Sequence, residues 1–149
     1  MAKNGDPRME VLLDRRMEVL LDLLERDRQH VMVYVGVCFG VPALSLSALK
    51  LEAVGVGLRV LLVLSLAGFV LAGIFYFLYA QRLHWMRLGG IQAIMDRNPE
   101  ALRTALFDPK TGPWARYAHL YLTGQVILVL AAVLYVGFFV LYAVLGVFS

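Results

Sequence analysis

The chain has 149 residues and is too apolar to be a soluble protein of its size. Hydrophobic residues make up 60% of it and its mean hydropathy is +0.72, whereas soluble domains are roughly 45–50% apolar. A short chain leaves a large share of its surface in water, so it has too little interior for this much apolar area. Length and composition therefore exclude a soluble globule, a secreted disulfide scaffold and a disordered tail.

The charged side chains are confined to blocks. Of 25 such residues, 13 lie in the first 30 positions and nine lie between positions 81 and 119, and the net charge is +3. Long uncharged stretches between charged blocks are typical of a polytopic membrane protein. No basic cluster resembles a nucleic-acid footprint, so we expect no nucleic-acid partner.

Three apolar runs predict an all-α fold with three transmembrane helices. Residues 31–49 contain no charge and would be about 28 Å long as a helix, close to the roughly 30 Å thickness of the hydrocarbon layer. Residues 54–80 follow closely enough to form a hairpin with this first span, so that 31–80 is one transmembrane hairpin. The third span is predicted at 120–148. Helices are required because lipid cannot satisfy free backbone groups.

The two charged blocks also contain helix signals. In residues 1–30 an apolar stripe with steps of four, three and four predicts an amphipathic helix that can serve in association. The stripe consists of Leu13, Met17, Leu20 and Leu24. In residues 81–119 the second helix is expected to continue beyond the span, and Asn98-Pro99 begins a short helix at 99–107. A restart at Gly112-Pro113 leads into the third span. Residues 81–119 are therefore expected to form a helical loop.

Lysine and arginine counts predict the orientation. Six of these residues lie in 1–30 and six in 81–119, but only Lys50 and Arg59 lie between the first two spans or just inside the second. The positive-inside rule places the N-terminus and the 81–119 loop in the cytoplasm and the C-terminus outside. Trp85 and Trp114 flank the loop, as in an aromatic belt at the cytoplasmic interface. The expected location is the plasma (inner) membrane, crossed several times.

Small residues follow one face of each of the first two spans. Membrane helices associate through close backbone approach, which small residues permit. The residues of the two faces are Gly36, Gly40, Ala43 and Ser47 in the first span and Ser65, Gly68 and Ala72 in the second. Two interpretations stay open: packing between the helices of one protomer, and packing between protomers.

Arg59 is the charged residue that lies within a predicted span. Charges at membrane depth usually have a partner or a water path, and Glu52 is close enough in sequence to be that partner. The pair is a candidate pore-lining or ion-interacting site. The alternative is that Arg59 extends to the outer headgroups and only anchors the helix.

No pattern predicts catalytic or metal chemistry. The three histidines fall at the cytoplasmic end of three different spans without a second group of ligands, so we expect no metal and no cofactor. These are His30, His84 and His119. The loop carboxylates lie in ordinary cap or turn contexts, so we expect no enzyme and no catalytic residue. They are Asp96, Glu100 and Asp108.

Two classes of function remain. The first is a small homo-oligomeric membrane protein that acts as a pore, a channel-like protein or a membrane effector. The alternative is a non-catalytic anchoring or assembly subunit of a larger membrane complex. In both, the partners are the lipid bilayer and either a second copy of the chain or another membrane subunit.

Overall fold

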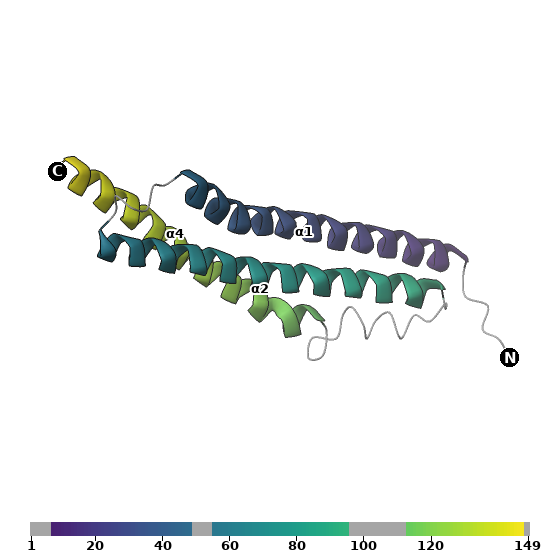
Figure 1. Ribbon diagram of the computed structural model, residues 1–149. Helices are drawn as coiled ribbons and strands as arrows, with labels where there is room; N and C mark the ends of the chain where they lie inside the picture. Colours follow the sequence, from purple (N-terminus) through teal and green to yellow (C-terminus); the bar gives the residue numbers. More distant parts are fainter. Residues whose placement is uncertain (1–6, 49–54, 96–112, 148–149) are drawn as a thin grey trace. The chain divides into compact units, whose positions relative to one another are not determined.

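The computed structural model describes residues 7–48, 55–95 and 113–147, and almost all of them are helical (Figure 1). Helix α1 covers Pro7–Ala48, α2 covers Val56–Met95 and α4 covers Pro113–Val147. No strand occurs in these three ranges. The all-α prediction is confirmed for this part of the chain.

All three described helices are long and apolar enough to cross a membrane. This agrees with the prediction of three transmembrane helices from the apolar runs. The described part of the chain is therefore all-helical, with three candidate membrane-spanning helices.

The helices extend beyond the predicted spans. Helix α1 runs without interruption from Pro7 through the predicted boundary at residue 31 and past Pro42, because residues 7–30 are rich in the strong helix formers Leu, Glu, Arg and Met. Helix α2 continues to Met95, as the sequence predicted. Helix α4 begins at Pro113, a residue whose fixed φ suits the first helical position.

Several predicted features lie outside the described residues. They are the short helix at 99–107 and the side chains of Leu13, Glu52, Asp96, Glu100, Asp108 and Trp114.

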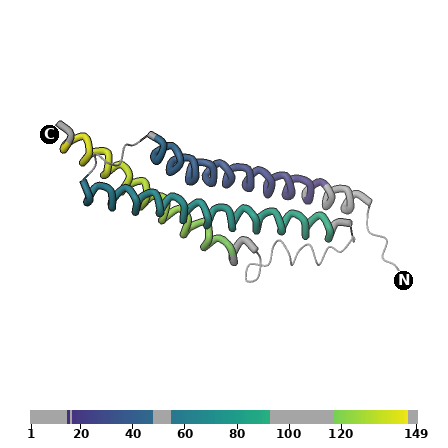
Figure 2. The backbone as a smooth tube through the Cα atoms, viewed as in Figure 1, coloured from purple at the N-terminus to yellow at the C-terminus, as the bar shows by residue number. Residues whose placement is uncertain are grey.

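The chain forms two compact units, each with parts of more than one helix. The juxtamembrane unit contains residues 1–30 and 81–116, and the membrane unit contains residues 31–80 and 117–149. Figure 2 follows the backbone of the described residues through both.

The core of the membrane unit is built from regularly spaced positions on the three helices. On α1 the buried residues follow steps of four, three, four and three, and on α4 the buried residues recur every seven positions. This spacing is typical of helices that pack side chains along a seam, as in coiled coils. The buried positions are Val31, Val35, Cys38, Pro42 and Ser45 on α1 and Gly124, Ala131 and Phe138 on α4. We call the α1 set the buried seam.

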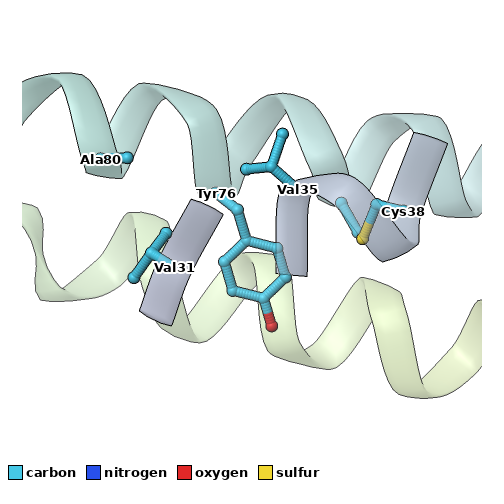
Figure 3. Close-up of a cluster of buried hydrophobic side chains, with 6 residues drawn as sticks. Val31, Val35, Cys38, Tyr76 and Ala80 are labelled. Atoms are coloured by element: carbon cyan, nitrogen blue, oxygen red, sulfur yellow. The ribbon is translucent and has the colours of Figure 1, made fainter. Parts of the chain in front are cut away.

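Two clusters of described residues lie in this core. One joins α1 and α2 around Tyr76, which extends from α2 past Val31 and Val35 with its hydroxyl toward α4 (Figure 3). The other joins α2 and α4 through Leu62, Leu66 and Phe138. Helix α2 therefore contributes to both clusters.

Glycines lie where helices of the membrane unit come closest. A Cβ atom added at Gly68 would lie 2.9 Å from the Cβ of Ala131, and one added at Gly73 would lie 3.0 Å from the Cβ of Cys38. At Gly124 the nearest neighbour would be the Cβ of Phe75, at 3.4 Å. These residues allow the close backbone approach that holds helices together in lipid.

Candidate association site

The small residues of the first span lie on an open surface of α1 in the part of the chain that the structure describes. Gly36, Ala43 and Ser47 are exposed, and a Cβ atom added at Gly36 or Gly40 would meet nothing within 4 Å. The Ser47 hydroxyl donates to the carbonyl oxygen of Leu44 in its own helix, at 2.8 Å. We call Gly36, Gly40, Ala43 and Ser47 the open face of α1.

The position of the open face on the helix explains this lack of contact. At about 100° per residue, its mean direction lies roughly 150° around α1 from that of the buried seam. Among the described residues, an added Cβ at Gly36 or Gly40 therefore meets no neighbouring helix, and packing within the protomer through this face stays a prediction. Packing between protomers stays a prediction.

Large apolar side chains border the open face. Met32 and Phe39 lie on one side and Val33 and Leu44 on the other, and each of the four is at least 40% exposed. The glycines form a small-residue strip between them, along which another helix backbone can approach closely.

The small residues of the second span have a different environment. Ser65 and Ala72 are fully buried, and the Ser65 hydroxyl donates to the carbonyl oxygen of Leu62 at 2.8 Å. Gly68 lies against Ala131 of α4. This face of α2 is occupied inside the protomer, with α4 as the neighbour at Gly68.

The N-terminal stripe is partly occupied within the juxtamembrane unit. Leu24 is 1% exposed, as is Leu83 of the same unit. Met17 and Leu20 are half-buried. Leu24 is therefore a core residue here, and a partner cannot reach it without opening this unit.

Arg59 is exposed at the end of the first turn of α2, where its backbone N–H donates to the carbonyl oxygen of Gly55 at 3.0 Å. Its suggested partner, Glu52, is not among the described residues, so their pairing stays a prediction.

A polar contact that the sequence did not predict joins α1 to α4. The hydroxyl oxygens of Ser45 and Tyr135 lie 2.6 Å apart, and Ser45 also donates to the carbonyl oxygen of Val41 at 2.7 Å. Because a serine hydroxyl has one proton, Tyr135 is the donor to Ser45. By contrast, the buried hydroxyl of Tyr76 has no hydrogen-bond partner among the residues that the structure describes.

A charged cluster joins α1 to α2 in the juxtamembrane unit. The Glu25 carboxylate accepts from Arg28 through one oxygen at 2.7 Å and from Arg87 through the other, also at 2.7 Å. The Arg28 hydrogen bond is the largest of several effects that lower the pKa of Glu25, to about 2. Glu25 precedes the uncharged run that begins at Val31. We call Glu25, Arg28 and Arg87 the charged cluster.

Sequence reasoning found only half of this cluster. A three-residue spacing on one helix favours the Glu25–Arg28 pair, whereas Arg87 is 62 positions away from Glu25. The sequence shows charged residues both before the first apolar run and after the second. This pattern does not specify which of these residues form an ion pair.

The histidines show no metal site. His30, His84 and His119 are all exposed, and in the ranges that the structure describes no group of three or more His, Cys, Asp or Glu side chains is placed to hold a metal ion.

A search of protein-family models gives no match for this sequence, and no curated protein or solved structure is significantly similar to it. The fold therefore defines a class only: an all-helical protein with three candidate membrane-spanning helices.

Proposed function

We propose that the chain is a non-catalytic, homo-oligomeric integral membrane protein whose copies associate through the open face of α1. The observation that carries this proposal is a contrast between glycines. An added Cβ at Gly68, Gly73 or Gly124 would contact another helix of the protomer, whereas Gly36 and Gly40 are four residues apart on α1 and an added Cβ at either would meet nothing within 4 Å among the described residues.

The energetics favour a partner on this face. A glycine in a helix interior costs about 1 kcal/mol relative to alanine, and no contact to Gly36 or Gly40 from a neighbouring helix offsets this cost among the described residues. In lipid the hydrophobic effect does not drive helices together, so close packing of small-residue faces is a main source of association energy. In a symmetric dimer, the open face of one copy would pack against the open face of the other.

The oligomer would act as a pore-like protein or a membrane effector. The support for a pore is limited to Arg59, an exposed charge on a predicted span. The alternative role, anchoring or assembly of a larger complex, would use the same open face on a different membrane subunit.

The mass of the purified protein–detergent particle tests this proposal. We expect a single defined multiple of the protomer, and Gly40→Ile should shift it toward one protomer while helical content is kept. Val37→Ile is the matched control, because Val37 is exposed on α1 but is not part of the open face. A monomeric parent, or equal masses for both variants and the parent, would contradict the proposal. A defined complex with a different protein would favour the assembly role.

The proposed location is the plasma (inner) membrane, with the N-terminus and the 81–119 loop in the cytoplasm and the C-terminus outside. The support is the distribution of lysine and arginine, with twelve in the two blocks assigned to the cytoplasm and two on the other side.

A further inference from the structure

The charged cluster has its cations outside and its anion inside. The side chains of Arg28 and Arg87 are 34% and 36% exposed, whereas that of Glu25 is 17% exposed. A simple ion pair needs one cation for each anion. Here one carboxylate lies between two guanidinium groups, so the cluster has an excess charge of +1 on its outer side.

Glu25 holds the two guanidinium groups close to each other. Arg28 donates to both carboxylate oxygens, at 2.7 and 3.1 Å, and Arg87 donates to one of them at 2.7 Å, so two cations that would otherwise repel are fixed on the same carboxylate. The Nε atom of Arg87 is covered and has no partner in the described part of the chain. A guanidinium group has five N–H donors, and the contacts to Glu25 use two on Arg28 and one on Arg87.

The cluster lies close to both apolar runs in the sequence. Glu25 is six residues before Val31, and Arg87 is seven residues after Ala80. In a chain that crosses a membrane, residues at this distance from the apolar runs fall near the lipid headgroups, where anionic phosphates are concentrated.

We propose that the charged cluster binds the phosphate of an anionic phospholipid headgroup. Guanidinium groups match phosphate oxygens in a forked geometry, and a phosphodiester carries one negative charge, which equals the excess charge of the cluster. Glu25 is the positioning residue and the two arginines are the binding residues. The site is separate from the open face of α1 and requires only that the helices cross a membrane.

Native mass spectrometry of the full-length protein tests this site. The protein is loaded with an equimolar mixture of phosphatidylglycerol and phosphatidylcholine, and the retained lipids are counted for each oligomeric state. We expect preferential retention of phosphatidylglycerol by the parent and a several-fold loss of that preference in Arg87→Gln and Arg28→Gln. Arg26→Gln is the matched control, because it removes the same charge from an exposed position of α1 outside the cluster.

The Glu25→Gln variant distinguishes lipid binding at the charged cluster from nonspecific attraction of anionic lipid to positive charge. This variant raises the net positive charge but loses the ionic contact to both arginines, so we expect weaker phosphatidylglycerol retention. Arg87→Lys keeps the positive charge but loses the forked arrangement of guanidinium donors, so it should retain less phosphatidylglycerol than the parent. Circular dichroism confirms that each compared variant keeps its helical content.

Four results would overturn the proposal. The first is equal retention of the two lipids by the parent, the second is an Arg26→Gln effect as large as that of Arg87→Gln, and the third is increased retention in Glu25→Gln. Displacement of the lipid by millimolar inorganic phosphate would also overturn the assignment to a lipid headgroup. Because the same spectra report the number of protomers, failure of this site is distinguishable from failure of oligomerisation.

Discussion

At the scale of single residues, the glycines of the helices should respond oppositely to an added methyl group. Gly68→Ala places a Cβ atom 2.9 Å from that of Ala131, and we expect this overpacking to lower the free energy of unfolding by about 1–3 kcal/mol. Gly36→Ala meets open space within the protomer, so in a Gly40→Ile background, where the copies are expected to separate, it should leave the free energy of unfolding unchanged or raise it by up to about 1 kcal/mol. Reversible denaturant unfolding in detergent measures both. Equal destabilisation by the two changes would contradict the helix contacts described above.

Two tyrosine hydroxyls offer a second comparison. Tyr135→Phe removes the hydrogen bond to Ser45 and should lower the free energy of unfolding by about 0.5–1.5 kcal/mol. Tyr76→Phe removes a buried hydroxyl without a partner among the described residues, so it should be neutral or stabilising by about 1 kcal/mol. The same unfolding assay measures both variants. A larger loss for Tyr76→Phe than for Tyr135→Phe would show that Tyr76 has a hydrogen-bond partner.

At the scale of helices, Leu24 should hold the N-terminal part of α1 within the juxtamembrane unit. Leu24→Ala removes a side chain that is 1% exposed, at a cost of about 2 kcal/mol or more, and should increase hydrogen exchange in residues 17–30. Leu23→Ala is the control, because the adjacent Leu23 is 51% exposed. If both variants exchange alike, Leu24 does not contribute to the packing of this unit.

The sequence was sufficient to place the helices but not to identify their inner faces. Apolar runs and Gly112-Pro113 predicted where the spans lie, because length and hydropathy are properties of one segment. The buried seam containing Val35 and the open face containing Gly36 have the same three- and four-residue spacing. In water, polarity would distinguish them. In lipid both faces are apolar, so only the packed structure shows which is buried.

The residues of the candidate association site were also predicted from the sequence, but their contact partners were not. Gly36 and Gly40 were identified from their spacing, but the spacing did not show whether their partner is the neighbouring helix or a second copy. Arg87 could not be assigned to Glu25, because a contact over 62 positions depends on how two helices pack.

At the scale of the whole molecule, the charge distribution predicts an inside N-terminus and an outside C-terminus. A reporter fused at Ser149 should be active only in the form that functions outside the cytoplasm, because the C-terminal flank lacks lysine and arginine. A fusion within the 81–119 loop should give the opposite result. Cytoplasmic activity at Ser149 would reverse the proposed orientation.

Disulfide cross-linking in native membranes tests the central claim, that two copies meet through the open face of α1. In a Cys38→Ala background the chain has no other thiol, and Gly40→Cys can form a disulfide between copies only if their backbones approach within about 7 Å. We predict a covalent dimer from Gly40→Cys on mild oxidation and none from Val133→Cys, which is exposed on α4. A folded Gly40→Cys protein that stays monomeric, or equal cross-linking at both positions, would contradict the claim.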